Sequence, residues 1–525
     1  MNLYLLTFVT LTAARQYLSP NRVPKWKTDN PNYGPDFGQP EQIHVSLGES
    51  PTEMVVTWLT FDDPGKTLVN YGPATEKKPS QVIEGKCTEF VDKQRKTKRR
   101  YIHRATLTGL TPGTTYNYRV GSEYGWSALY RFTALSPRED GGYEIAVFGD
   151  LGNQNARSLG KLQRLAQDGD IDMVFHVGDF AYNMDTDNGR VGDEFMRQLE
   201  PIAAYVPYMT AVGNHEAAAN FSHYANRFTM PRTDDNMLYS FDLGSAHFIF
   251  FSTEFYFSTE YGWKQIQNQW NWLMNDLTEA NANRESVPWI FTFGHRPMYC
   301  SDFDGDDCTK YESIIRTGLP KTHAYGLEKL FYQFGVDVEI WAHEHSYERM
   351  WPVFNRTVYN GTVSPYTNPL APVHIVSGSA GCRENTDMFV SDPGPWSARR
   401  SSDYGFGILR VHNATHVHFR QVAAYKDETQ DDFWIIKHPH HSYKHEHRRK
   451  PAAFTYHGFR RSAVVLVSHR NRAGAYGVQY YRRCSIIYDD YGVDPITCTA
   501  TAEERSSHIS TPLLAKDVGH SSRQL

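Results

Sequence analysis

The spacing of apolar and polar residues divides this chain into three regions. In the first, residues 40–135, apolar and polar residues alternate over short segments at 43–47, 54–58, 104–107 and 115–120. A period of two, interrupted by glycine and proline turns, is typical of half-buried strands. We therefore predict a β-rich N-terminal domain, in which we find no motif that carries chemistry.

The second region, residues 143–437, has short apolar runs that lead into polar loops and then into stretches with helical spacing. The runs at 144–148, 173–177, 287–293 and 336–341 predict buried strands, and residues 156–167 and 262–280 predict helices. Such alternation is typical of a layered α/β domain, in which ligands bind where strands end in loops. The third region, residues 438–525, shows no regular period and is assigned no function.

Composition and charge narrow the class of protein. The 525 residues leave room for two or three domains, and a hydrophobic content of 40% excludes a chain that is disordered throughout. The formal net charge of −5 gives no nucleic-acid footprint, so we expect no nucleic-acid binding; we interpret the basic run at residues 93–100 as a solvated loop. No run of about 18 apolar residues is present, so we expect no membrane anchor.

The N-terminus and the sequons indicate the secretory pathway. Residues 3–14 form an uncharged apolar run that ends in small residues, so we assign residues 1–20 to a signal peptide. We expect a secreted, extracellular protein, with a lysosomal location as the alternative. The candidate glycosylation sites are Asn220, Asn355, Asn360 and Asn413. Cys300 and Cys308 flank a short acidic loop and are placed to form a local disulfide, whereas the pairing of the other cysteines stays open.

Five short motifs follow strands of the second region, and each places metal-binding residue types in a loop. They are Gly149-Asp150-Leu151-Gly152, Gly178-Asp179-Phe180-Ala181-Tyr182, Gly213-Asn214-His215-Glu216, Gly294-His295-Arg296-Pro297 and Ala342-His343-Glu344-His345. One such motif alone has a structural explanation, because an aspartate after a strand often caps a helix and a single histidine is usually structural. Five in succession predict a metal site.

The donor types suggest two ions of different character. Carboxylate and phenolate are hard donors suited to a trivalent ion, whereas imidazole and an amide oxygen suit a divalent one. One carboxylate can bridge two ions about 3.5–4 Å apart, the spacing used in two-metal hydrolysis. On a straight strand His343 and His345 would share a face and each reach one ion. Glu344 would then point away, in a structural role.

In this order the five motifs resemble those of the metallophosphoesterase superfamily. The tyrosine three residues after the second aspartate, and Ala-His-Glu-His-Ser-Tyr-Glu-Arg at residues 342–349, resemble purple acid phosphatases, in particular their large animal branch. Residues 109–120 also resemble the corner and strand of a fibronectin type III module. The resemblance implies an α+β multidomain protein, with a fibronectin III-like β-sandwich at 40–135 and a four-layer α/β metallophosphoesterase sandwich at 143–437.

The resemblance also implies which residues bind the ions. The implied ligands are Asp150, Tyr182 and His345 for Fe(III), Asn214, His295 and His343 for a divalent ion (zinc, iron or manganese), and Asp179 as the bridge. A Tyr182 phenolate on Fe(III) would give the purple colour of the family.

His215 has a different implied role: it is not a ligand, but hydrogen-bonds the substrate phosphate and protonates the leaving alkoxide. Histidine side chains are protonated below about pH 6.5, so acid conditions favour both roles. The implied reaction is hydrolysis of a phosphate monoester, in which a metal-held hydroxide attacks phosphorus while the ions offset the developing charge. No protein nucleophile is needed.

One loop departs from the family pattern. Many members carry a further substrate-contacting histidine after the position of His295, where this chain has Arg296 and then an acidic stretch containing Asp302, Asp304, Asp306 and Asp307. We interpret Arg296 as either a phosphate ligand or a partner in a structural salt bridge. His323 lies outside the motifs and is interpreted as a surface histidine.

Two alternative functions are another metallophosphoesterase activity and a non-catalytic binding role. A phosphodiesterase or phosphoprotein phosphatase of the same superfamily commonly lacks the tyrosine found here at Tyr182. A non-catalytic secreted binding protein built on the scaffold would be expected to lack a ligand, whereas all seven are present.

Overall fold

A computed structural model of the protein describes residues 38–92, 99–303, 305–426 and 428–438, and the backbone of short strands between residues 460 and 500. The chain divides into one compact unit, Met1–Lys450, and a second, Pro451–Leu525. The described strands of the second unit pair antiparallel and are β25 (Arg460–Ala463), β26 (Arg482–Asp489), β27 (Gly492–Val493) and β28 (Thr497–Ala500). The predicted signal peptide and most of the 438–525 tail lie outside the described residues.

The first unit begins with a β-sandwich: the alternating pattern predicted its strands, and the fibronectin III-like resemblance implied the sandwich. One sheet has the order β1-β2-β6-β5 and the other β4-β3-β7-β8, with β9 also paired to β7. The strands are β1 (Glu41–Leu47), β2 (Met54–Thr60), β3 (Leu68–Pro73), β4 (Gln81–Glu84), β5 (Lys86–Val91), β6 (Arg99–Leu107), β7 (Thr115–Ser122), β8 (Gly125–Trp126) and β9 (Tyr130–Thr133). Apolar side chains from both sheets, including Val56, Trp58, Val69, Tyr118 and Phe132, form one buried core between them.

Two mixed sheets form the centre of the described α/β region. The first has the order β12-β11-β10-β22-β23-β24 and the second β13-β14-β15-β16-β20-β17-β21. Strands of the first are β10 (Glu144–Phe148), β11 (Met173–Val177), β12 (Tyr208–Ala211), β22 (Gly405–Val411), β23 (His416–Ala423) and β24 (Thr429–Ile436). Strands of the second are β13 (Tyr239–Leu243), β14 (Ala246–Phe250), β15 (Trp289–Phe293), β16 (Val338–Trp341), β17 (Tyr347–Met350), β20 (Val373–Ser377) and β21 (Ser397–Ser401). A short hairpin pairs β18 (Val353–Phe354) with β19 (Thr357–Val358).

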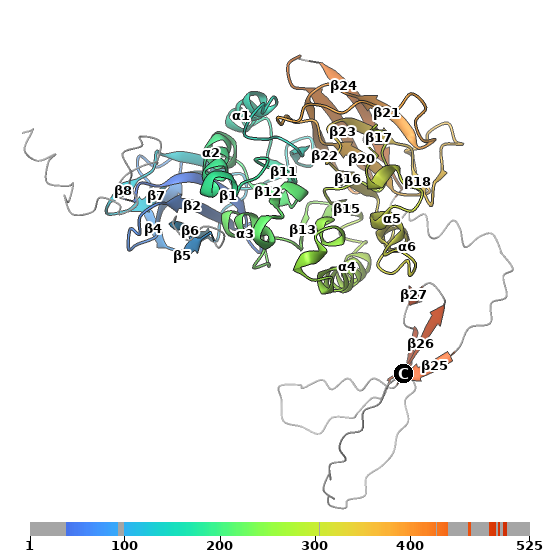
Figure 1. The fold of residues 1–525 in the computed structure, drawn as a ribbon. Coiled ribbons are helices and arrows are strands. Elements are labelled where there is room, and N and C mark those ends of the chain that lie inside the picture. Colours follow the sequence, from blue (N-terminus) through green and yellow to red (C-terminus); the bar gives the residue numbers. More distant parts are fainter. Residues whose placement is uncertain are drawn as a thin grey trace, which may run out of the picture. The chain divides into compact units, whose positions relative to one another are not determined.

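The two sheets pack face to face through aromatic side chains. The ring of Phe175 on β11 lies 5.3 Å from that of Phe248, 5.1 Å from that of Phe250 and 5.0 Å from that of Phe293, all on the second sheet. Helices complete the layers: α1 (Leu159–Asp168), α2 (Thr186–Ala203), α3 (Ala218–Arg227), α4 (Lys264–Ala282), α5 (Ile314–Thr317) and α6 (Leu327–Phe334). α1 packs on α2 and α4 on α6 (Figure 1). Helices on the outer faces of two stacked sheets give the four-layer sandwich that was expected.

A buried ion pair fastens the β-sandwich to the α/β region. Arg100 on β6 donates from Nε and Nη2 to the carboxylate of Asp193 on α2, at 2.8 and 2.7 Å, and Arg227 lies 2.9 Å from the same carboxylate. Burial opposes ionisation of Asp193, but both arginines outweigh it and hold the pKa of Asp193 below its usual range. The interpretation of residues 93–100 as a solvated loop is therefore wrong for Arg100, which is fully buried because it has this partner; residues 93–98 are not described.

One predicted helix is shorter at its N-terminal end than its pattern indicated. The predicted helix at 156–167 begins three residues later, at Leu159, after a turn in which the Leu159 N–H donates to the Ala156 carbonyl. Among the described residues, no helix combines the length and the apolar character that crossing a bilayer requires.

Candidate metal centre

The strand order brings together the ends of strands that are distant in sequence. β10, β11 and β12 run parallel, so their carboxyl ends share one edge, and Asp150, Asp179 and Asn214 follow these ends. In the second sheet β15 and β16 are also parallel, and His295 and His343 follow them. Because the sheets are stacked, both sets of loops meet at one edge of the sandwich.

Motif glycines are needed where these loops touch. A Cβ at Gly178 would lie 2.4 Å from Nδ1 of His295, and a Cβ at Gly213 would lie 2.2 Å from Oδ1 of Asp179. Neither position has room for a side chain, which explains why a glycine precedes Asp179 and Asn214.

The loops also contain strained backbone. Asp150, Asp179, Tyr182 and His343 have φ angles of 60°, 54°, 54° and 73°, in the left-handed region that non-glycine residues rarely adopt. Such a conformation costs about 1–3 kcal/mol per residue and persists where the surrounding structure imposes it, frequently at functional sites. Four such residues in one set of loops support the assignment of this edge as the site.

The three predicted iron ligands form one group. The Tyr182 hydroxyl lies 3.1 Å from Oδ1 of Asp150 and 2.7 Å from Nε2 of His345, and this Nε2 is 3.5 Å from Oδ1 of Asp150. All three side chains are buried. Carboxylate, phenol and imidazole donors therefore converge on one point.

The predicted ligands of the divalent ion form a second group around His295. Its Nε2 lies 3.1 Å from Oδ1 of Asn214, 3.2 Å from Nδ1 of His343 and 3.2 Å from Oδ2 of Asp179. A hydrogen bond joins the two groups: the backbone N–H of His343 donates to Oδ2 of Asp150, at 3.0 Å.

Hydrogen bonds made by the Nδ1 atoms of His295 and His345 fix which ring nitrogen faces the ligand groups. His295 donates from Nδ1 to the carbonyl of Val177 at 2.8 Å, and His345 donates from Nδ1 to the carbonyl of Asn385 at 3.0 Å. Each Nε2 therefore presents its lone pair to the centre, the arrangement in which metal-binding histidines are usually held.

The electrostatics show that this cluster needs positive charge. Burial disfavours protonation of both histidines, but the carboxylates of Asp179 and Asp150 outweigh it at His295 and raise its pKa to about 10. Asp150 and the Cys382 thiol do the same at His345 and raise its pKa to about 12. Burial, and then the charge of Asp150, holds the pKa of Tyr182 well above its usual value, so a phenolate requires a nearby cation. The donor set thus fits two metal ions, which would replace the protons on the imidazoles.

Two details of the sequence prediction are wrong. His343 and His345 do not lie on a straight strand, because β16 ends at Trp341 and both follow it in a tight loop before β17. The left-handed backbone at His343 turns the chain so that the two imidazoles reach different groups. Glu344 is buried, with Oε1 3.0 Å from Sγ of Cys308, but a carboxylate oxygen also lies within 4.8 Å of a ring nitrogen of His343, so the expectation that it points away is wrong for His343.

His215 stands beside the metal ligands and not among them. Its backbone N–H donates to Oδ1 of Asp179 at 2.9 Å, and its ring lies 4.3 Å from that of Tyr182. Oδ1 of Asn183 accepts from Nδ1 at 2.7 Å, which leaves Nε2 as the nitrogen available to a substrate. Nε2 is 3.8 Å from Oε1 of Glu384, and the side chain is 19% exposed. A bound phosphate could therefore reach it.

Sequence reasoning missed two supporting residues and left one undecided. The buried carboxylate of Glu216 accepts from the N–H groups of Asp179, Phe180 and Gly213 at 2.9–3.0 Å, and so ties two motif loops together. Asn183 orients His215. Both adjoin predicted site residues, but side-chain type alone does not distinguish such supports from surface residues. Arg296 contacts both oxygens of Glu254 at 3.1 Å, so the salt-bridge interpretation holds for it.

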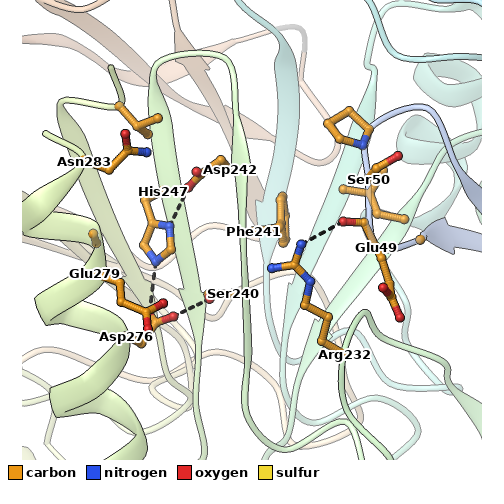
Figure 2. Close-up of a pocket in the computed structure, with 15 residues that line it drawn as sticks. Glu49, Ser50, Arg232, Ser240, Phe241, Asp242, His247, Asp276, Glu279 and Asn283 are labelled. Carbon is orange, nitrogen blue, oxygen red and sulfur yellow. Dashed lines mark hydrogen bonds and ion pairs between the residues drawn. The ribbon is translucent and has the colours of Figure 1, made fainter. Parts of the chain in front are cut away.

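A separate cavity of about 400 Å³ is lined by the loop after β1, by strands β13 and β14, and by helix α4. Figure 2 shows His247 there between two carboxylates: its Nδ1 is 2.6 Å from Oδ1 of Asp242 and its Nε2 is 3.0 Å from Oδ2 of Asp276. The two aspartates bind opposite nitrogens, so this arrangement is an ion-pair network and does not chelate a metal.

This network predicts a pH-dependent stability. Burial disfavours the charged His247, but hydrogen bonds with Asp242 and Asp276 raise its pKa to about 9. The folded chain thus holds the proton more tightly than the unfolded chain, so up to about 3 kcal/mol of stabilisation is complete below about pH 6.5 and lost as the pH rises through about 9. Glu49, Arg232 and Glu279 are the other charged side chains that line the cavity.

The measurement is the unfolding free energy of His247→Gln relative to the native protein, from about pH 6 to about pH 10. We expect the deficit of the variant to be largest at the acid end and to disappear at the alkaline end. Exposed His323, replaced by glutamine, is the control. A deficit that does not change with pH would contradict the prediction.

Comparison with known proteins agrees with this geometry. Three family models match: purple acid phosphatase, N-terminal domain, over residues 40–134; calcineurin-like phosphoesterase over residues 143–347; and iron/zinc purple acid phosphatase-like protein C over residues 371–432. Acid phosphatase type 7 of Mus musculus is 51% identical over 76% of this chain and 91% of its own length, and the Homo sapiens protein is 49% identical over 77% and 92%.

A solved structure has the same fold. Purple acid phosphatase PPD1 from yellow lupin (Lupinus luteus) seeds aligns with a TM-score of 0.63 and 23% identity, over 76% of this chain and 75% of its own. The predicted fold class, a β-rich N-terminal domain followed by a metallophosphoesterase α/β domain, is therefore confirmed.

Proposed function

This chain belongs to the purple acid phosphatase family, and on that premise we propose that it is a secreted acid phosphatase which hydrolyses phosphate monoesters at a dinuclear Fe(III)–M(II) centre. M is zinc, iron or manganese. The observation that carries the proposal is the convergence of hard donors at Tyr182 and of imidazole and amide donors at His295, with Asp179 in contact with the second group.

The division of donors suggests which residues hold each ion. Asp150, Tyr182 and His345 would hold Fe(III), Asn214, His295 and His343 would hold the divalent ion, and Asp179 would contact both. When bound, the two ions would lower the pKa of coordinated water and neutralise charge on the phosphoryl oxygens.

The remaining steps depend on this chain's own residues. Nε2 of His215 is not bound by Asn183 and its side chain is partly exposed, so it can donate a hydrogen bond to phosphate and then a proton to the leaving alkoxide. Asn183 holds the opposite nitrogen, so the ring keeps its orientation during the transfer. Glu216 keeps the loops of Asp179 and Asn214 in register, which maintains the distance between His215 and the ligands.

Secretion is the second part of the proposal. All four sequon asparagines, Asn220, Asn355, Asn360 and Asn413, are exposed and accessible to a glycosyltransferase. The disulfide expected between Cys300 and Cys308 is formed, which agrees with an oxidising compartment. A lysosomal location is the alternative destination on the same route.

Metal analysis and a visible spectrum test the proposal. Protein collected from the medium of a eukaryotic host should carry about two metal ions per chain, including iron, and should show a broad band at roughly 500–600 nm. Tyr182→Phe should abolish this band, because it removes the only phenol among the seven proposed ligands.

Tyr256→Phe is the matched control, since its hydroxyl is buried and donates to the Tyr325 carbonyl away from the centre. Its spectrum should be unchanged. Metal-loaded, oxidised protein without the band would mean that the iron–tyrosinate assignment is wrong. Greater activity on phosphate diesters than on monoesters would favour the phosphodiesterase alternative.

A further inference from the structure

The acidic loop that departs from the family pattern reaches the metal centre. Oδ2 of Asp306 makes a short contact with Nε2 of His343, the imidazole nitrogen that faces away from His295. The Asp306 side chain is 39% exposed and that of His343 is 14% exposed, so the contact is partly open to solvent. No motif predicted it.

The ligand role proposed for His343 decides which of its nitrogens carries the proton. Nη1 of Arg296 lies 2.8 Å from Nε2 of His343, but a guanidinium only donates, so of the two neighbours of Nε2 only the Asp306 carboxylate can accept from an Nε2–H. Nδ1 of His343 faces His295, where a ligand must present a lone pair, so the hydrogen of the neutral imidazole is on Nε2. Nε2–H therefore donates to Asp306. Nη1 of Arg296 lies 3.5 Å from Oδ2 of Asp306, and its positive charge attracts this carboxylate.

The position of Asp306 is fixed by its neighbours in sequence. Cys308 is bound to Cys300, which lies five residues after His295. The carboxylate of Asp307 accepts from the Ser313 hydroxyl at 2.6 Å and from the Ile314 N–H at 3.1 Å, at the start of α5. Both anchors hold the short helix η4 (Asp307–Thr309), which begins directly after Asp306.

The disulfide is itself packed against the motif that carries His343. Sγ of Cys308 lies 3.0 Å from Oε1 of Glu344, and both residues are buried. The disulfide and the histidine motif are thus in direct contact close to Asp306 and His343.

We propose that Asp306, anchored by the Cys300–Cys308 disulfide, is a positioning residue that orients His343 toward the divalent ion. Asp306 accepts a hydrogen bond from His343, just as the backbone carbonyls of Val177 and Asn385 accept hydrogen bonds from His295 and His345. The inference rests on the proposed dinuclear centre. Loss of such a partner typically raises the metal dissociation constant about 10–100-fold.

The test measures zinc affinity, by competition with a chelator, in protein that retains its iron. Asp306→Ala should raise the zinc dissociation constant about 10–100-fold. Asp306→Asn, whose amide oxygen still accepts from Nε2–H, should stay within about threefold of the native value. The Tyr182 band should be unchanged in both, because its ligands belong to the other group.

Glu312→Ala is the control, since it removes a charge from an exposed residue of the same segment. The double variant Cys300→Ser, Cys308→Ser should weaken zinc binding as Asp306→Ala does. Native affinity in Asp306→Ala, or an equal loss in Asp306→Asn, would overturn the positioning role. If the native protein itself bound no divalent ion, the proposed function would fail, and this inference with it.

Discussion

Replacing Asp179 with asparagine is expected to lower kcat/KM about 10³-fold, equivalent to about 4 kcal/mol of transition-state stabilisation. The carboxylate lies 3.2 Å from Nε2 of His295 and accepts from the His215 N–H, so it contacts both the ligand group and the proton donor. Burial opposes its ionisation, but the charge and hydrogen bond of His295 outweigh this and hold its pKa below the usual range. Asparagine keeps the shape and loses the charge that two cations would share.

The measurement combines metal content with steady-state kinetics. We expect Asp179→Asn to bind fewer than two metal ions per chain and to lose activity. Asp170→Asn, an exposed carboxylate in the turn before β11, should match the native protein in both. If Asp179→Asn kept two ions and activity within about tenfold, Asp179 would not be the bridge.

The second large effect concerns His215. His215→Asn should lower kcat about 10²–10⁴-fold, the range for a positioned general acid, and leave metal content and the visible band unchanged. The ring of His215 contacts that of Tyr182, and its Nε2 lies 3.9 Å from Oδ2 of Asp179, but His215 is not one of the seven proposed ligands, so its side chain is not needed to hold an ion.

Leaving-group dependence separates proton transfer from other roles of this residue. An alkyl phosphate needs a proton on its leaving oxygen, whereas an aryl phosphate with an acidic phenol does not. The loss in His215→Asn should therefore be much larger for the alkyl substrate. Equal losses would show that His215 binds phosphate without acting as the acid. His323→Asn, an exposed histidine with left-handed backbone, is the control.

Family, fold class and the identity of the candidate ligands follow from the sequence because the signals are local. Each motif stands directly after a buried strand, and parallel strands deliver their carboxyl ends to one edge of a sheet whatever the rest of the chain does. The period of two in residues 40–135 likewise predicts half-buried strands, and the resemblance to a fibronectin type III module implies that they form a β-sandwich. The Cys300–Cys308 disulfide was predictable because it closes a short loop.

Other features depend on contacts between residues far apart in the chain, and the sequence does not specify them. Arg100 belongs to a basic run, yet it is buried because Asp193, 93 residues away, neutralises it. His343 and His345 reach different groups because the chain turns in left-handed backbone, not because they share the face of a strand.

The sequence by itself determined which chemical groups are available: the hard and soft donors, the histidine outside the ligand set and the acidic loop after His295. Only the tertiary structure decided their pairings, since hydrogen-bond geometry depends on distances that sequence spacing does not fix. It placed Arg296 on Glu254, Asn183 on His215, and Asp306 on His343. Donor type is a property of each residue, whereas orientation is a property of the packed fold.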